Sequence, residues 1–326
     1  MKPLATANAL PTNGKRFYSH GKLLLTAEYL VLDGAEAIAI PCRFGQDLCI
    51  EENHESKTIH WKAYTNEKTI WGDFSFPIAA LKHPLDAQPK NEKDFLIKLL
   101  QIAKKLNPSF LENSIGCSVR THLEFPRDWG LGSSSTLIHN VALWASVDPY
   151  KLLGLSMGGS GYDIACAAAK NPIRYRRETA TQPLHIQDIS LETVLVKEAV
   201  FIHLNQKQDS RAGINTYLKQ KAAHAFSLNE ALEQINILSR SLLDAKDVKT
   251  LMASMEAHEA FVGSIIQTTP VKERLFKDYP GAIKSLGAWG GDFIMAVSEQ
   301  LNPLETKEYF FNKGYTTSFY YTEMAL

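Results

Sequence analysis

Apolar positions recur every second residue just before residue 126 and at helical spacing shortly after it. Val119, Leu123 and Phe125 alternate with polar residues, which predicts a strand. Apolar residues at 137, 141 and 144 then follow the spacing of one helix face. The pattern therefore predicts a strand and a helix joined by a loop from Pro126 to Thr136.

The same patterns predict further elements along the chain. Strands are expected at 22–26, at 29–32 before a turn at Asp33-Gly34, and at 37–40, where Pro41 is expected to end the strand. More strands are expected near 48–50 and 58–61, at 173–177, within 191–204 and within 316–322. Helices are expected at 95–106, at 164–170 and over most of 211–266.

The loop itself is rich in groups that bind anions. Two glycines, Gly130 and Gly132, are followed by Ser133, Ser134 and Ser135. Glycine permits tight backbone turns, and a helix N-terminus offers unpaired N–H groups and a positive dipole end. The loop lacks the Gly-Lys-Ser/Thr step of a Walker loop and the third glycine of a dinucleotide fingerprint. Two interpretations stay open at this point, a phosphate site of another design and an ordinary glycine-serine loop.

Composition narrows the function classes. The 326 residues are 45% hydrophobic and 21% charged, with 35 basic and 35 acidic residues. This balance gives no support for nucleic acid or a membrane surface as the main partner. No apolar run approaches the ~20 residues of a membrane helix, and residues 1–14 lack a hydrophobic signal core, so we expect a cytoplasmic protein. The four cysteines have no zinc spacing and are expected to be buried, reduced thiols.

Three further segments extend the pattern: Gly21-Lys22, Gly158–Asp163 and Gly287–Asp292. Together with the loop they make the chain resemble the GHMP kinases, named for galactokinase, homoserine kinase, mevalonate kinase and phosphomevalonate kinase. The resemblance covers nearly the full length. The first motif corresponds to 20–29, the second to 126–136, the active-site aspartate segment to 159–163 and the third motif to 287–291.

The resemblance implies an α+β, two-domain GHMP kinase fold. The N-terminal domain, like domain 2 of ribosomal protein S5, is expected over 1–185 and carries the phosphate-binding loop. A ferredoxin-like C-terminal domain is expected over 186–326, with the site in the cleft between the two. The boundary rests on the polar stretch 178–187.

The resemblance also implies ATP and Mg²⁺ as cofactors and a small-molecule alcohol or phosphomonoester as acceptor. Glu28-Tyr29 and the segment 161–165 resemble the mevalonate-pathway branch, and phosphomevalonate kinases most of all. The implied activity is phosphorylation of phosphomevalonate in isoprenoid precursor synthesis. The alternatives are mevalonate kinase, diphosphomevalonate decarboxylase and a nucleotide-binding regulatory relative without turnover. A homodimer is possible.

Residue roles carry over by position. Asp163 and Lys22 are the expected catalytic residues, and Ser134 is the expected Mg²⁺ ligand. The nucleotide phosphates are expected on a loop formed by Gly130, Leu131, Gly132, Ser133, Ser134 and Ser135. The acceptor is expected to contact Glu28, Tyr29, Ser160, Gly161, Arg174 and Arg176.

Each assignment has a structural alternative. Arg174 and Arg176 share one strand face, which is either a phosphate-binding face or a solvated one. Arg177, Lys207 and Arg211 are further candidate cations.

The chain departs from the family pattern at three places. His20 replaces the usual proline before the Gly-Lys step, and Trp289 replaces a small residue. Family members often supply a glutamate as a second metal ligand about ten residues before the aspartate. The corresponding segment here, 149–154, contains no acid. These departures leave the acidic Mg²⁺ ligand open and keep the regulatory alternative.

Overall fold

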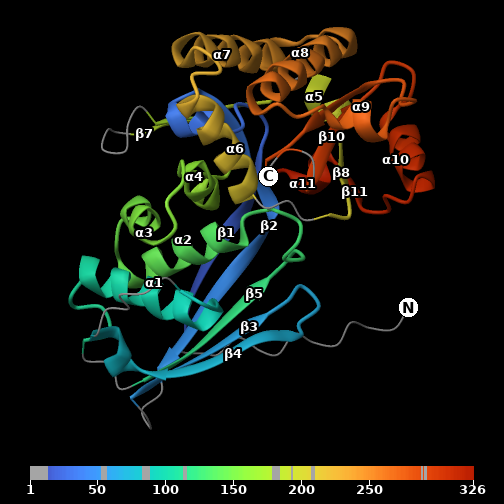
Figure 1. Cartoon of the computed structure of the whole chain (residues 1–326). Coiled ribbons are helices and arrows are strands. Elements are labelled where there is room, and N and C mark those ends of the chain that lie inside the picture. Colours follow the sequence, from blue (N-terminus) through green and yellow to red (C-terminus); the bar gives the residue numbers. More distant parts are fainter. Residues whose placement is uncertain are drawn as a thin grey trace, which may run out of the picture. The chain divides into compact units, whose positions relative to one another are not determined.

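The computed structural model describes residues 14–52, 57–82, 89–112, 116–177, 184–191, 194–206, 210–287, 289 and 292–326. Contacts between Cα atoms divide the chain into two compact units whose residues are interleaved in sequence (Figure 1). The first unit runs to Ser19 and includes Gly45–Phe125 and Ser134–Gly158. The second contains His20–Phe44, Pro126–Ser133 and Gly159–Leu326. A domain boundary after residue 185 stays a prediction.

The first unit is a sheet covered by helices. Its strands have the order β4-β3-β5-β2, with bounds β2 (Ala37–Glu52), β3 (Thr58–Tyr64), β4 (Ile70–Pro77) and β5 (Cys117–Leu123). In this unit β2 pairs with β5 through residues 46–52. The remaining elements are η2 (Ile78–Lys82), α1 (Glu92–Leu106), α2 (Ser133–Ala145) and α3 (Pro149–Ser156). Strand β1 (Lys15–Leu24) begins here and continues into the second unit.

Alternating burial explains why the helices cover one face of this sheet. In β3, Ile59, Trp61 and Ala63 are buried and the residues between them are not. The Trp61 ring lies 6.4 Å from that of Trp144 in α2, between ring centroids. Helix α1 starts at Asn91, whose side chain accepts a hydrogen bond from the Asp94 N–H as an N-cap. The apolar stripes thus hold the helices that follow the strands against the sheet (Figure 1).

The second unit contains a short three-strand ladder, a four-stranded sheet and most of the helices. Strand β6 (Ile173–Arg177) pairs with residues 37–39 of β2 and with β7 (Leu184–Asp188). The antiparallel sheet has the order β11-β8-β10-β9, with bounds β8 (Val200–His203), β9 (Ala282–Ser285), β10 (Phe293–Val297) and β11 (Ser318–Tyr320). The helices are η1 (Leu30–Asp33), α4 (Tyr162–Ala168), α5 (Val194–Glu198), α6 (Ser210–Ala222), α7 (Leu228–Asp244), α8 (Val248–Ile266), α9 (Val271–Leu275), α10 (Pro303–Asn312) and α11 (Tyr321–Met324).

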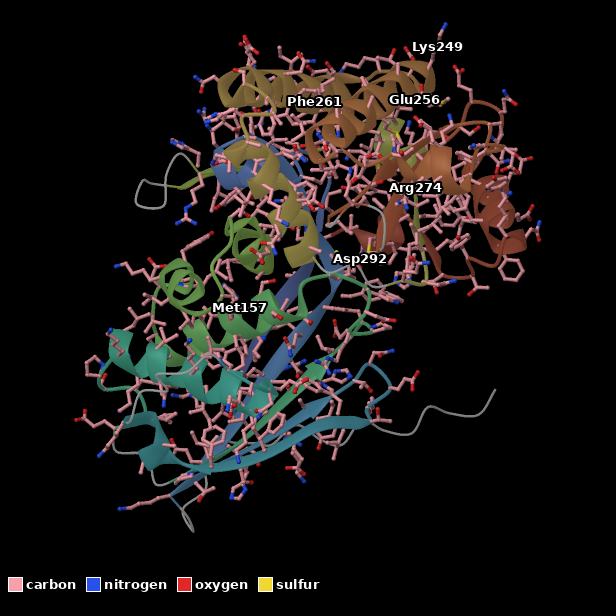
Figure 2. All side chains as sticks on the ribbon, viewed as in Figure 1. Met157, Lys249, Glu256, Phe261, Arg274 and Asp292 are labelled. Carbon is pink, nitrogen blue, oxygen red and sulfur yellow. The ribbon has the colours of Figure 1, made fainter. Side chains whose placement is uncertain are left out.

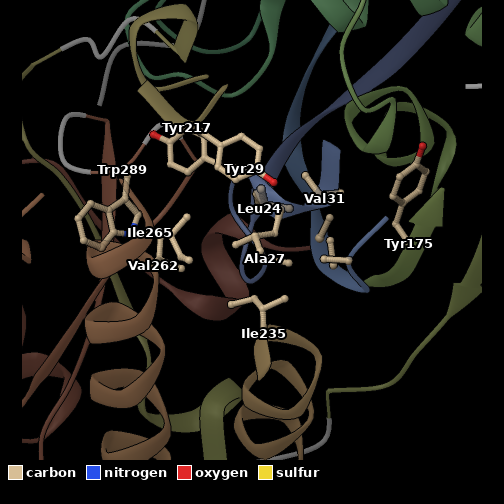
Figure 3. Packing of buried hydrophobic residues seen from close by; sticks show 14 of the residues in the cluster. Leu24, Ala27, Tyr29, Val31, Tyr175, Tyr217, Ile235, Val262, Ile265 and Trp289 are labelled. Carbon is tan, nitrogen blue, oxygen red and sulfur yellow. The ribbon is translucent and has the colours of Figure 1, made fainter. Parts of the chain in front are cut away.

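One buried cluster in this unit surrounds the segment after β1. Figure 3 shows Ala27 and Tyr29 of that segment packed among Ile235 of α7 and Val262 and Ile265 of α8. Helices α7 and α8 lie side by side along this cluster (Figure 1). The first motif is therefore attached to the hydrophobic core of the second unit.

Most predicted elements are confirmed, including the strand and helix that flank the glycine-serine loop, and the class is α+β. The prediction of a strand at 29–32 is wrong. This stretch forms η1, because Ala27 and Tyr29 have positive φ angles of 63° and 64° and turn the chain out of the extended region. A run of only four mostly apolar residues is compatible with a buried strand and with a buried helix. The pattern of 29–32 therefore did not distinguish between these two structures.

One other prediction needs correction. Pro41 does not end a strand, because β2 continues to Glu52. Residues 37–39 of β2 pair with β6 and residues 46–52 pair with β5, and Pro41 lies between these two stretches. Because proline has no N–H, its position there removes no hydrogen bond from the pairing with β6 or with β5. The strands expected within 191–204 and 316–322 are confirmed as β8 and β11, and the same segments also contain the helix α5 and the start of α11 at Tyr321.

Candidate functional site

The glycine-serine loop occupies the junction that the sequence predicts. It follows β5, and α2 begins at Ser133. Gly130 and Gly132 have φ angles of 66° and 88°, a region that side chains rarely adopt. Leu131 is fully buried, whereas Ser134 is exposed and Ser135 is buried at the start of α2 in the first unit. The glycines thus provide the backbone turn that brings the chain to a helix N-terminus, where N–H groups can bind an anion.

An aromatic cluster anchors the start of this loop. The Trp129 ring meets the edges of Phe293 and Phe319 at centroid distances of 5.7 and 5.3 Å, and it lies 5.9 Å from Phe44. All four residues belong to the second unit. Because such edge-to-face contacts fix ring orientation, the backbone before Gly130 is held against β10 and β11.

Lys22 contacts the loop through its backbone and its side chain. Its N–H donates to the Leu131 carbonyl at 3.0 Å, and its Nζ donates to the Gly130 carbonyl at 2.8 Å. The ammonium also lies 5.7 Å from the centre of the Tyr162 ring. The first and second motifs are therefore joined at Lys22.

The surroundings of Lys22 favour the charged form of its side chain. Burial lowers the pKa of its ammonium, but Tyr162, Asp163 and Asp292 raise that pKa, and the net shift is upward. Burial raises the pKa of the Tyr162 phenol to about 12, against a smaller lowering by Lys22. At neutral pH the pair is thus an ammonium beside a neutral phenol, with two carboxylates near enough to act on the ammonium.

Asp163 lies in the first turn of α4, after a glycine with a φ of 91° at Gly161. Its Oδ1 accepts a hydrogen bond from the Ile164 N–H at 3.2 Å, and the side chain is partly exposed. The preceding loop is tied to β6, because the Tyr175 hydroxyl donates to the Ser160 carbonyl at 2.5 Å. The carboxylate is thus held on a fixed turn and stays accessible.

The sequence interpretation missed one acid at this place. Asp292 is 8% exposed, and a Cβ placed on Gly130 would lie 2.1 Å from its Oδ2, so the carboxylate packs directly on the loop backbone. Asp292 is labelled in Figure 2. Gly287, with a φ of 61°, also lies near Lys22, since a Cβ there would be 3.9 Å from the ammonium nitrogen. The signal was present, because Gly287 and Asp292 are the two ends of the third glycine segment, of which 288, 290 and 291 lie outside the described residues.

Glu28 and Tyr29 occupy interior positions. Glu28 has no exposed surface, and its Oε1 accepts a hydrogen bond from the Lys284 ammonium at 2.6 Å. The Tyr29 ring is stacked on that of Tyr217 with 6.2 Å between centroids, and it is 6% exposed. This placement gives both side chains structural contacts, and acceptor binding by them stays a prediction. Trp289 is 3% exposed and belongs to the same buried cluster.

The basic strand presents its side chains as the alternation predicts. Arg174 pairs with Glu36 at 3.5 Å and Arg176 is exposed, so the two lie on the face opposite to Tyr175. Arg177 lies on the Tyr175 face and donates from Nη1 to the Gly159 carbonyl at 3.2 Å. Arg177 is thus the basic residue of β6 that contacts the loop before Asp163. Lys207 and the side chain of Arg211 lie outside the described residues.

The described residues contain no group of three or more histidine, cysteine, aspartate or glutamate side chains arranged to hold a metal ion. The four cysteines are buried and unpaired, as expected. Among the helices in the described ranges, none combines the length and apolar character needed to cross a membrane.

Comparisons with known proteins identify the fold. No protein-family model matches the sequence, and no curated protein matches it significantly in sequence. In structure the chain is similar to the Lin0012 protein from Listeria innocua, with 19% identity, a TM-score of 0.70, and coverage of 94% of this chain and 97% of that one. It is also similar to Streptococcus pneumoniae phosphomevalonate kinase in complex with phosphomevalonate and AMPPNP. Here the identity is 17% and the TM-score 0.69, and the match covers 94% of this chain and 99% of that one. A third neighbour is Methanococcus jannaschii mevalonate kinase, with 15% identity, a TM-score of 0.66, and coverage of 95% of this chain and 98% of that one. The chain therefore has the GHMP kinase fold, as the resemblance implies.

Proposed function

We propose that this protein is an ATP-dependent phosphotransferase of the GHMP type that phosphorylates phosphomevalonate. The observation that supports it most is the contact of Lys22 with the Gly130 carbonyl, because it joins a partly buried cation to the glycine-serine loop beside two carboxylates. The similarity to a phosphomevalonate kinase that binds phosphomevalonate and AMPPNP supports the same conclusion at the level of the fold.

Different residues would have different roles in phosphoryl transfer. Such reactions depend on positioning and on stabilising the charge of the transferred group. The loop from Gly130 to Ser135 would bind the nucleotide phosphates through backbone N–H groups and hydroxyls. Lys22 would neutralise negative charge near the acceptor oxygen, and Asp163 would accept its proton or orient it.

The available donors fit Mg²⁺, which prefers hard oxygen ligands and keeps several waters. The Ser134 hydroxyl is exposed at the helix start, and Asp163 and Asp292 are the carboxylates that act on Lys22. We propose Ser134 as one ligand, with bound waters completing the coordination. Bound Mg²⁺ would neutralise phosphate charge during transfer.

A phosphorylated acceptor suits the charges at this site. A phosphomonoester has a second pKa near ~6, so it is largely dianionic at neutral pH and requires cations more than a base. Lys22 and Arg177 supply cations next to the Asp163 loop. We keep Arg174 and Arg176 as proposed contacts of the acceptor. To bind it, Arg174 would have to leave Glu36, and the exposed Arg176 would have to give up its contact with solvent.

A coupled assay of ADP release with mevalonate, phosphomevalonate, galactose and homoserine tests the proposal. We expect phosphomevalonate to give the highest kcat/KM. Preference for unphosphorylated mevalonate would instead assign a mevalonate kinase, and CO₂ release from diphosphomevalonate would assign the decarboxylase. ATP binding without turnover of any acceptor would contradict the proposal and favour a regulatory protein.

A further inference from the structure

A group of ionisable side chains in the second unit has almost no access to water. Glu28, Lys284 and His258 have no exposed surface, and Glu259 is 2% exposed. Lys284 Nζ lies 2.6 Å from Glu28 Oε1 and 3.9 Å from Glu259 Oε1. Burying such a pair removes its hydration, and apolar side chains of similar volume often give equal or greater stability. Stability alone therefore does not explain why this cluster is charged.

The cluster holds a strained turn that directly follows the strand of Lys22. Ala27 and Tyr29, on either side of Glu28, have φ angles of 63° and 64°, which are unusual for residues with side chains. The Ala27 N–H donates to His258 Nε2 at 3.2 Å, which fixes the turn from the side of α8. Such strain persists only where surrounding contacts over-determine the backbone. The ion pair and this hydrogen bond are those contacts (Figure 3 shows Ala27 and Tyr29).

The other end of the ion pair precedes the third glycine cluster. Lys284 lies in β9, and its ammonium also donates to the Ser285 carbonyl at 3.1 Å. Glu259 accepts hydrogen bonds from the Ser285 N–H and hydroxyl, both at 2.9 Å. Two residues further on, Gly287 lies next to the Lys22 ammonium. The residues just before Gly287 are thus held from two sides.

These contacts form a closed ring. It runs from Lys22 along the chain to Glu28, across the ion pair to Lys284, along β9 to Gly287 and back to the Lys22 ammonium. We propose that Glu28 and Lys284 are positioning residues whose buried ion pair fixes the Gly287 backbone against Lys22 for phosphoryl transfer. This proposal rests on the proposed function, since it assigns a role to the same site.

A double-mutant comparison separates positioning from simple stabilisation. Glu28→Gln and Lys284→Met each leave a buried partner unpaired and are expected to lower the melting temperature. The double variant Glu28→Gln/Lys284→Met removes both charges, so its melting temperature should return to within about 4 °C of the parent. Its kcat should remain about 10- to 100-fold below the parent, because small misplacements of catalytic groups have effects of that size. Its Kd for ATP should change less than threefold.

Two further variants complete the design. Glu28→Asp keeps the charge but shortens the side chain, so it should fold and show a smaller loss of kcat at unchanged ATP affinity. Lys221→Gln is the matched control, because Lys221 forms an ion pair with Asp33 at 2.5 Å in the same unit. The control should retain the parental kcat. Parental kcat in the double variant, or in Glu28→Asp if the double variant does not fold, would overturn the positioning role.

The test also distinguishes this proposal from the proposed function. If the parent protein transfers no phosphoryl group to any acceptor, the proposed function fails, and crystal structures then decide the positioning role. A shift of Gly287 relative to Lys22 by about 1 Å or more in the double variant, or in Glu28→Asp, would support it. An unchanged position in the variant would overturn it.

Discussion

Glu259 should make the stability of the protein depend on pH in a way that one substitution removes. Burial raises the pKa of this carboxyl from 4.5 to about 8, with a further raising by Glu28 and an opposing lowering by Lys284 and Ser285. The folded chain therefore binds this proton more tightly than the unfolded chain. The resulting stabilisation is complete below pH 4.5 and is lost as the pH rises through about 8.

The magnitude follows from the linkage relation. Each unit of pKa difference corresponds to about 1.4 kcal/mol, so the loss between the two pKa values is at most roughly 5 kcal/mol. Glu259→Gln has nearly the shape of the protonated acid and cannot titrate. We therefore expect the free energy of unfolding of the parent, minus that of Glu259→Gln, to fall steadily between pH 5 and pH 8.

Urea unfolding of both proteins at constant ionic strength measures this difference. Subtracting the variant cancels the titration of groups elsewhere in the chain. The neighbouring His258 has its pKa lowered by burial and by Lys284, and it is present in both proteins, so the subtraction also compares like with like at this residue. A difference that stays constant from pH 5 to pH 9 would refute the reasoning, because it would mean that Glu259 releases its proton at similar pH in the folded and unfolded states.

Three substitutions at the candidate site give further tests. Gly132→Val should abolish ATP binding measured by calorimetry, because a branched side chain is strained at a φ of 88°; unchanged ATP affinity would remove the loop from the site. Asp163→Asn should lower kcat about 100-fold with little change in the Kd for ATP, and normal turnover would exclude Asp163 from the chemistry. Gly130→Ala should weaken ATP binding, because its Cβ would lie 2.1 Å from Asp292 Oδ2 and a side chain is strained at a φ of 66°; parental affinity in this variant would contradict that expectation.

The position of the glycine-serine loop between a strand and a helix could be predicted because its signals are local, whereas Lys22 and Asp163 were selected by the resemblance and their roles stay predictions. The loop combines a strand period, two glycines and a helix period within about 30 residues, and each element formed nearly where its pattern indicates. The segment 29–32 failed for a physical reason, since its conformation depends on two positive φ angles and on contacts with α7 and α8 that its composition does not reveal.

The contacts that complete the site join residues far apart in sequence. Glu28 and Lys284 are separated by 256 residues, and nothing near either one indicates its partner. Glu28 was therefore assigned to the acceptor, although its side chain lies in the interior. Asp292 was similarly missed as a neighbour of Gly130, because the approach depends on how β10 meets the loop. Sequence patterns predict elements and motifs, but pairing between elements requires the fold.

The central claim is transfer of a phosphoryl group by this chain, and phosphorus NMR observes that transfer directly. With ATP, Mg²⁺ and phosphomevalonate, the parent protein should convert the phosphomonoester signal into the two signals of a diphosphate while ATP becomes ADP. Lys22→Met should bring about this conversion much more slowly under the same conditions. Unchanged phosphomevalonate beside intact ATP, or ADP accompanied only by inorganic phosphate, would contradict the account.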